Sequence, residues 1–404
     1  MNQHYPHMFA PLTVGNITFK NRVFSAPTTA HMIQNNAPSY PEPSYIATYL
    51  EKARGGVACV SCGGQKVTLT GRNPVHTEFN ITEPAGWRNF IHMTSAMHFY
   101  DARCSYELIH FGSEGEYTEE ARKDIIYGCS DFVRGDGLRF HQMPVEEMEK
   151  LAARYAELAE CVRFCGFDTL LIHGGHGTLL QEFVSPRGNH RTDEFGGPIE
   201  NRARYPLMQF KAIKDTFGQD FLVECHISGE DPEGGITVED TVKFAKLAEG
   251  LVDILMIRAA DIELAHPTGY NSEEGNPVTL RVAQAIKDSG TKLIVCPSGG
   301  YQDLDLDVRY LAENKCDMIA MARSFIADPD YYRKAVEGRG EDVIPCLRCD
   351  KCHVAFMGGP WINVCSVNPL YGIEHRYERL IESVSPRKIA VIGGGPIGMR
   401  AALY

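Results

Sequence analysis

Eight short apolar runs recur between residues 22 and 322, and longer segments of mixed polarity separate most of them. Such short, nearly continuous runs are typical of parallel strands that are covered on both faces. They predict eight buried strands, at residues 22–27, 57–62, 103–110, 168–173, 221–227, 252–257, 292–297 and 317–322.

The clearest helical pattern lies between the third and fourth runs. Pro144 precedes it, acidic residues fill its first turn and Gly166 follows it, which are usual start and stop signals. Its apolar positions recur at spacings of three and four residues, at Val145, Met148, Leu151, Ala152, Tyr155, Leu158, Ala159 and Val162.

The alternation of strands and helices over residues 20–340 predicts an α/β fold, a (β/α)8 TIM barrel. A doubly wound open sheet is the alternative, because periodicity alone cannot show that a sheet closes. In a barrel, functional residues lie at the carboxyl ends of the strands. The glycine-rich turns at 298–300 and 321–324 follow the last two strands, where barrels bind phosphate, although they could also be plain tight turns.

The fourth run ends in HGGHGT, which places His173 and His176 at the mouth of a strand. This pattern alone fits a substrate contact, a metal site, or ordinary core or surface histidines. A metal site needs further ligands, and none is visible nearby in the sequence.

A second group of candidate ligands lies in CLRCDKCHVAFMGGPWINVC. Three closely spaced thiolates and a fourth returned by a turn can wrap a [4Fe–4S] cluster. A zinc site prefers two separated pairs of cysteines, so the spacing favours the cluster. The predicted ligands are Cys346, Cys349, Cys352 and Cys365. Cys59 and Cys62 fall within a strand and should point to different surroundings, so we interpret them as core residues.

The tail RKIAVIGGGPIGMRAALY carries Gly393, Gly395 and Gly398 between an apolar run and a helical start, which is the fingerprint of a dinucleotide-binding domain. A working unit needs roughly 30 residues, so we expect the start of a Rossmann domain in a longer protein. The predicted domains are a barrel (1–340), a cysteine loop and linker (341–385) and the start of a truncated dinucleotide-binding domain (386–404).

Composition narrows the class of protein. The 404 residues include 40 Lys+Arg and 52 Asp+Glu, a net charge of −12, which argues against nucleic-acid and anionic-membrane partners. No export signal or long apolar segment is visible, so we expect a soluble cytoplasmic protein and leave a homo-oligomer open. Thirteen cysteines in such a chain favour metal or redox chemistry over disulfides.

Taken together, these features resemble the old yellow enzyme superfamily, in its iron–sulfur branch of 2,4-dienoyl-CoA reductases, enoate reductases and trimethylamine dehydrogenase. The resemblance rests on APLTVGNITFKNRV (10–23), SPRGNHRTDEFGGPIENRARYP (185–206), MARSFIADPD (321–330) and the cysteine loop. It implies FMN in the barrel, a [4Fe–4S] cluster, and FAD and NAD(P)H in C-terminal domains. It also implies hydride transfer from reduced FMN to the β-carbon of an activated C=C bond of a small unsaturated carbonyl substrate.

The resemblance assigns flavin contacts by position. The strand-one loop and strand-two turn would face the ring, and the last two turns would hold the phosphate. These residues are Pro27, Thr28, Thr29, Gly64, Gly299, Gly300, Ala322 and Arg323. The family usually has Gln and Arg at the pyrimidine edge, where this chain has Glu107 and His226.

The resemblance also assigns substrate contacts to His173 and His176, at the end of the fourth strand. Arg187 is a further candidate, as a partner for an acidic group of the substrate. Thr178 replaces the tyrosine that donates a proton in most relatives, and a threonine hydroxyl is too weak an acid for that role. The candidate acids are then His176, His266 and Tyr270.

Two other functions remain alternatives. An amine demethylase of trimethylamine dehydrogenase type would carry a flavin-linking cysteine where this chain has Thr29, and an aromatic cage that Trp87 and Trp361 alone make improbable. A non-catalytic flavin or electron-transfer module would explain the departures from the family pattern.

Overall fold

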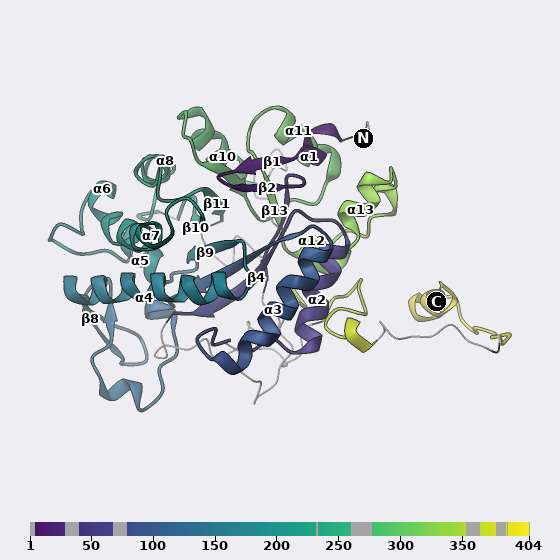
Figure 1. The fold of residues 1–404 in the computed structure, drawn as a ribbon, viewed down its shortest axis with the longest axis horizontal. Helices are drawn as coiled ribbons and strands as arrows, with labels where there is room; N and C mark the ends of the chain where they lie inside the picture. The colour runs from purple at the N-terminus through teal and green to yellow at the C-terminus, as the bar shows by residue number, and fades with distance from the viewer. Residues whose placement is uncertain are drawn as a thin grey trace.

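The computed structural model describes residues 5–28, 40–67, 79–231, 233–259, 277–352, 364–376, 385 and 387–403. All eight predicted strands are present, and they form the centre of the molecule (Figure 1). They are β3 (Val23–Thr28), β4 (Cys59–Lys66), β5 (Arg103–Ile109), β9 (Thr169–Gly174), β10 (Leu222–Ser228), β11 (Ile254–Arg258), β12 (Ile294–Pro297) and β13 (Ile319–Met321).

The sheet closes into a barrel. Its strand order is β12-β11-β10-β9-β5-β4-β3-β13, and every neighbouring pair is parallel. The two end strands meet through a parallel bridge between Ser298 and Ala320, and the Asp317 amide donates to the Val295 carbonyl at 2.9 Å. This closure confirms the TIM barrel and excludes the open sheet.

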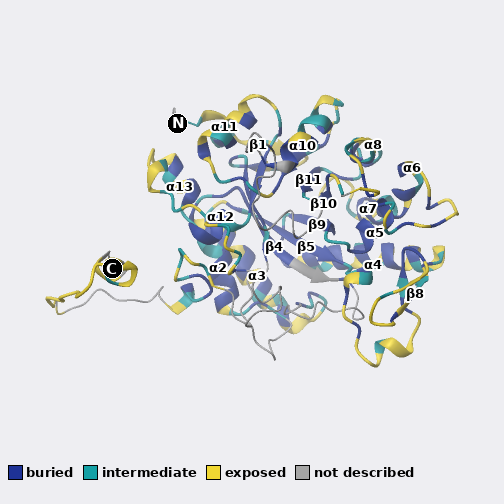
Figure 2. Ribbon diagram, turned by 180° about the vertical axis from the view of Figure 1, so that it is seen from behind, coloured by how far each residue is buried: buried dark blue, intermediate teal, exposed yellow. Residues whose placement is uncertain are grey.

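Helices surround the strands, with their buried faces turned inward (Figures 1 and 2). The predicted helix is α4, whose apolar stripe is buried except for Val145, at its exposed first position. The longer helices are α2 (Pro43–Arg54), α3 (Pro84–Phe99), α4 (Val145–Phe164), α7 (Arg204–Phe217), α8 (Val238–Leu247), α10 (Val278–Asp288) and α11 (Leu304–Ala312). The shorter ones are α1 (Pro6–Phe9), α5 (Leu179–Val184), α6 (Ile199–Arg202), α12 (Arg323–Ala327) and α13 (Tyr331–Val336).

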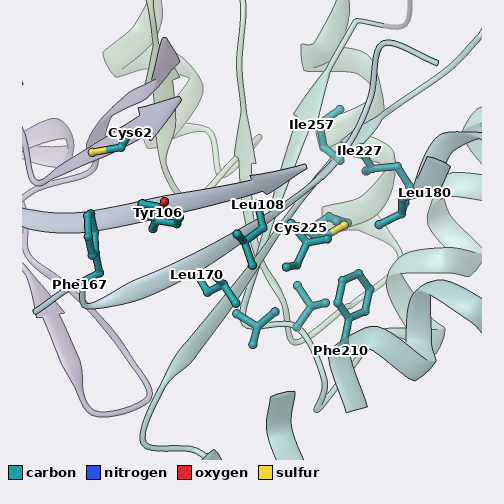
Figure 3. Close-up of a cluster of buried hydrophobic side chains, with 14 of the residues drawn as sticks. Cys62, Tyr106, Leu108, Phe167, Leu170, Leu180, Phe210, Cys225, Ile227 and Ile257 are labelled. Carbon is teal, nitrogen blue, oxygen red and sulfur yellow. The ribbon is translucent and has the colours of Figure 1, made fainter. Parts of the chain in front are cut away.

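Strand side chains alternate between two cores. Outward residues such as Tyr106 and Leu108 pack in the large cluster between strands and helices (Figure 3). Inward residues form a smaller cluster inside the barrel. Cys62 belongs to the outer cluster and Cys59 to the inner one, which confirms both as core residues that cannot act as a pair.

A hairpin of β1 (Leu12–Val14) and β2 (Ile17–Phe19) contributes Val14 and Phe19 to the inner cluster. The Phe19 ring lies 4.9 Å from that of Phe24, which begins the run of inward residues on β3. The hairpin therefore packs against the amino-terminal ends of the strands and leaves chemistry to the carboxyl ends. Beyond β5, a small sheet combines β6 (Tyr127–Gly128), β7 (Phe132–Val133) and β8 (Arg139–Gln142).

The tail differs from its prediction. The helical start is present as α14 (Pro396–Leu403), but residues 387–394 form no strand. Ile389, Ile392 and Ile397 are 84–98 % exposed, and α14 stands apart from the barrel in Figure 1. A strand needs a partner for its backbone groups, and the described residues supply none for this segment.

Candidate active site

Four polar side chains meet inside the carboxyl end of the barrel. Glu107 comes from β5, His173 from β9, His226 from β10 and Arg258 from β11, and each is only 4–6 % exposed. Strand register brings them together, because His173 pairs with His226 across β9 and β10, and Arg258 pairs with Ser228 across β10 and β11. All four lie on inward-facing positions, where a barrel presents its functional groups.

Glu107 fixes the orientation of the histidine pair. Its Oε1 lies 2.8 Å from His173 Nδ1, and His173 Nε2 lies 3.0 Å from His176 Nδ1. Burial alone would raise the pKa of Glu107, but the charge and hydrogen bond of His173, with a smaller contribution from His226, lower it to about 2. The carboxylate is therefore ionised and holds the proton of His173 on Nδ1.

The turn around His176 has an unusual backbone. His176 adopts φ of 57° and Gly177 a φ of 74°, and the two imidazole rings stack with centroids 5.1 Å apart. Left-handed φ is uncommon for a side chain other than glycine, and such strain gathers at functional sites. The turn brings a nitrogen of the second imidazole within hydrogen-bond distance of the first, with the two rings nearly parallel.

Ser298 positions the ring of His226. Its hydroxyl donates to the Ile257 carbonyl at 3.1 Å and lies 3.2 Å from His226 Nε2, from which it accepts when Nε2 carries the ring proton. The buried Nδ1 of His226 then has a bare lone pair, with no hydrogen-bond partner among the described residues and Glu107 Oε1 at 3.8 Å.

Burial, together with the positive charges of His173 and Arg258, lowers the pKa of His226 to about 4, although Glu107 opposes this effect. With the ring proton on Nε2, His226 Nδ1 and the Glu107 carboxylate are two acceptors that face each other. Such a pair calls for a hydrogen-bond donor between them, and a ligand N–H group would supply it.

Thr178 does not offer a proton. Its hydroxyl is buried and donates to the Gly175 carbonyl at 2.8 Å, where it closes the turn before α5. This geometry agrees with the expectation that the acid must come from elsewhere. Arg187, in contrast, is exposed and follows α5, and the described contacts do not connect it with the buried cluster.

Pro27 and Thr28 end β3, and Gly64 lies within β4, so all three belong to strand ends of the barrel. Buried Lys52 on α2 donates to Thr28 Oγ1 at 2.7 Å, and burial lowers the pKa of this lysine to about 8. Sequence reasoning missed Lys52, because nothing distinguishes one lysine within a helix. Thr29, His266 and Tyr270 lie outside the described residues.

The predicted phosphate turn has an open backbone. Gly299 and Gly300 have φ of 93° and 87°, and a Cβ on Gly299 would meet nothing within 4 Å. Ala322 directly precedes α12. The Arg323 guanidinium lies 2.7 Å from the carboxylate of Asp350 in the cysteine loop, and its contact with a phosphate stays a prediction.

The four predicted ligand cysteines surround one hollow. Arg323, Ile326 and Asp350 complete much of its lining, together with Cys346, Cys349, Cys352 and Cys365. Arg348 and Asp350 have φ of 54° and 53°, so the backbone between the first three cysteines turns left-handed twice. Each such residue costs of the order of 1 kcal/mol, and the result is a loop whose thiols gather on one side.

In the tail, Gly393 has φ of 114°, and a Cβ on Gly398 would lie 1.9 Å from the Gly393 carbonyl oxygen. Both positions therefore require glycine. Gly395 lies between them in open space.

Comparison with known proteins assigns the family. Residues 7–342 match the model of the NADH:flavin oxidoreductase / NADH oxidase family, and the chain belongs to that family. It is 28% identical to NADH oxidase of Thermoanaerobacter brockii over 99% of this chain and 61% of the relative. It is 27% identical to N,N-dimethylglycine/sarcosine dehydrogenase of Chromohalobacter salexigens (98% and 58%), and 26% identical to cinnamate reductase of Clostridium sporogenes (100% and 63%).

Among solved structures, a 2-naphthoyl-CoA reductase complex superposes with a TM-score of 0.87 at 25% identity, over 98% of this chain and 62% of the other. These matches support the old yellow enzyme branch and an oxidoreductase. The chain spans about three fifths of the length of these curated relatives. None of the helices in the described residues is long and apolar enough to cross a membrane.

Proposed function

We propose that this chain forms the barrel and cluster part of an NAD(P)H-dependent flavoenzyme that reduces an activated C=C bond. The observation that carries the proposal is the His173–His176 pair, which Glu107 orients at the carboxyl end of the barrel. Of the ring nitrogens of this pair, His176 Nε2 is the one not engaged by these two contacts, and an N–H group there can hold the carbonyl oxygen of an enone, enoate or enoyl thioester and polarise its double bond.

The residues around the pair fit a flavin. The bare Nδ1 of His226 and the carboxylate of Glu107 are acceptors for an N–H group, which the pyrimidine ring of FMN carries. The open turn of Gly299 and Gly300 offers backbone amides to a phosphate. Bound FMN would supply hydride transfer.

The chain of hydrogen bonds also suits proton delivery. With His173 donating to Glu107, its Nε2 accepts from His176 Nδ1, and protonated His176 then carries a second proton on Nε2. We assign His176 as the proton donor to the α-carbon, with His266 and Tyr270 as the other candidates.

The cysteine hollow suits a [4Fe–4S] cluster of four thiolate ligands. The pair of Arg323 and Asp350 joins its loop to the end of the barrel. In this proposal, FAD and NAD(P)H bind to further parts of a longer protein, and electrons reach the barrel through the cluster.

The described side chains of the site are poorly suited to an amine substrate. Arg258 presents positive charge and the histidines present imidazole groups, whereas an alkylammonium ion needs carboxylates or aromatic faces. Among the described side chains of the cluster, the carboxylate is that of Glu107, which already accepts from His173.

An anaerobic assay of the full-length protein tests the proposal. FMN and iron are quantified first, and NAD(P)H oxidation is then followed with enones, enoates and enoyl thioesters, and separately reduction of an artificial acceptor with methylated amines. We expect NAD(P)H oxidation with at least one alkene and none of the amine activity. If the protein is fully loaded with FMN and no alkene causes NAD(P)H oxidation, the proposal is overturned.

A further inference from the structure

The fold supplies metal ligands that the sequence around His173 does not show. Strand β9, which carries His173, lies between β5 with Glu107 and β10 with His226, so the barrel brings the three side chains to one place. One ligand atom from each side chain lies within 4.8 Å of the ligand atoms of the other two. All three side chains are buried, with 4–6 % exposure, so the barrel holds them in position.

The distances suit a metal ion at the centre of this group. Glu107 Oε1 lies 2.8 Å from His173 Nδ1 and 3.8 Å from His226 Nδ1. Ligand atoms that each lie about 2.0–2.2 Å from a tetrahedral zinc ion are separated by about 3.4 Å from one another. This separation falls between the two distances, so side-chain shifts on the order of 1 Å would place the three ligand atoms around one ion.

His226 offers a nitrogen that such an ion would use. Its buried Nδ1 has no hydrogen-bond partner among the described residues, and a buried polar atom of this kind calls for a ligand. With a metal on Nδ1, the ring proton lies on Nε2, where Ser298 Oγ at 3.2 Å can accept it. Metal-binding histidines usually donate their other ring N–H in this way, which fixes the orientation of the ring.

His173 has the same arrangement. Its Nδ1 faces Glu107, and its Nε2 lies 3.0 Å from His176 Nδ1. Where a metal takes the place of the proton on Nδ1, Nε2 carries the ring proton and donates it to His176. Both histidines therefore have a partner for the nitrogen that points away from the metal.

The ligand types select the class of metal. Two imidazoles and one carboxylate suit Zn²⁺ and other divalent transition metals, whereas Mg²⁺ and Ca²⁺ prefer sites built from several oxygen atoms. Arg258 is buried at the same end of the barrel, and its positive charge opposes a cation that strong ligand bonds do not hold.

We propose that Glu107, His173 and His226 bind a divalent transition metal ion such as Zn²⁺ in the flavin-free protein. Three protein ligands leave a fourth position for water. The metal uses Glu107 and His226 Nδ1, the acceptors that the proposed function offers to an N–H group of FMN, so metal and FMN exclude each other. The exclusion rests on the proposed function, whereas the metal site rests on the three side chains alone.

Metal titration of full-length protein freed of FMN tests the site. Zn²⁺ and Mg²⁺ are titrated by calorimetry, and Co²⁺ is followed by its absorption spectrum, in which thiolate ligands would add a strong near-ultraviolet band. We expect saturable binding of Zn²⁺ at least about 100-fold tighter than that of Mg²⁺, and a Co²⁺ spectrum without the thiolate band. Equal affinity for the two metals, no saturable binding of Zn²⁺, or a thiolate band alone would overturn the proposal.

Two variants each remove one ligand. Glu107→Gln and His226→Asn should both weaken Zn²⁺ binding about 100-fold or more, since loss of even an outer partner of a metal ligand costs about 10–100-fold. If Glu107→Gln does not fold, His226→Asn carries the test. His98→Asn is the matched control, because His98 on α3 forms another histidine–carboxylate pair, with Nε2 2.8 Å from Asp168 Oδ2. Unchanged Zn²⁺ affinity in folded His226→Asn, or an equal loss in His98→Asn, would contradict the assignment.

The exclusion is tested by FMN binding to wild type with and without saturating Zn²⁺. We expect FMN affinity to fall about tenfold or more with Zn²⁺ present, because a ligand that binds one form withdraws it from the other equilibrium. Unchanged FMN affinity would refute the exclusion. Because these measurements involve no turnover, a failure of the proposed reaction would appear separately, as Zn²⁺ binding to the flavin-free protein without NAD(P)H oxidation by alkenes in the FMN-loaded protein.

Discussion

Two buried glutamates inside the barrel should respond to amide substitution in opposite ways. Glu107 on β5 has its pKa lowered to about 2, chiefly because His173 outweighs the effect of burial. Glu224 on β10 is fully buried, and burial raises its pKa to about 7, although a hydrogen bond with Thr169 opposes the shift. Its Oε2 has no hydrogen-bond partner among the described residues.

Each shift from the ordinary value of 4.5 corresponds to about 3 kcal/mol, since one pKa unit is about 1.4 kcal/mol. Glu107 is more acidic when folded, so its contribution to stability is present above pH 4.5 and disappears as pH falls towards 2. Glu224 is less acidic when folded, so stability is lost as pH rises from 4.5 through about 7.

Chemical unfolding of Glu107→Gln and Glu224→Gln at about pH 5, 6.5 and 8 separates the two cases. Glu107→Gln should be less stable than wild type by up to about 3 kcal/mol, with little change across this range. The free energy of unfolding of Glu224→Gln, relative to that of wild type, should rise by about 2 kcal/mol between the lowest and the highest pH. A Glu107→Gln protein as stable as wild type, or a Glu224→Gln difference that is independent of pH, would refute the reasoning.

Two further variants test the cysteine hollow and the turn. Cys349→Ser should abolish stable iron binding in the anaerobically reconstituted protein, measured as iron per chain. The control Cys161→Ser, on α4, should retain the iron. Retained iron in Cys349→Ser would contradict the cluster assignment. Thr178→Val removes the hydrogen bond to the Gly175 carbonyl, so the free energy of unfolding should fall by about 1 kcal/mol. The rate of alkene reduction should change less than about threefold. A loss of activity above about 100-fold would give the hydroxyl a catalytic role.

The sequence was informative about the barrel because its strands are buried on both faces. All eight apolar runs correspond to strands, and the stripe of α4 corresponds to its buried face. Closure depends on contacts between β12 and β13, such as the Ser298–Ala320 bridge, which no local pattern reports. The apolar run before Gly393 forms no strand, because a strand also needs a neighbour and the described residues supply none.

The candidate site was predictable only in part. His173 and His176 were identifiable because they end a buried run in a glycine-rich turn. The contact of Arg258 with Gly175 joins residues of different strands, and the pairing of Arg323 with Asp350 joins the barrel to the cysteine loop. Both depend on side-chain directions in three dimensions. A charged residue at the very end of a buried run, as in LMIR, was the signal available for Arg258.

The central claim is that the histidine pair acts on the alkene and not on the delivery of electrons. It is tested most directly by rapid mixing of the reduced full-length protein with an alkene acceptor, for wild type, His173→Asn and His176→Asn, with flavin absorbance as the signal. Both variants should keep FMN and accept electrons from NAD(P)H at the wild-type rate, while reoxidation by the alkene slows about 100-fold or more. Reoxidation of both variants at the wild-type rate would contradict the account.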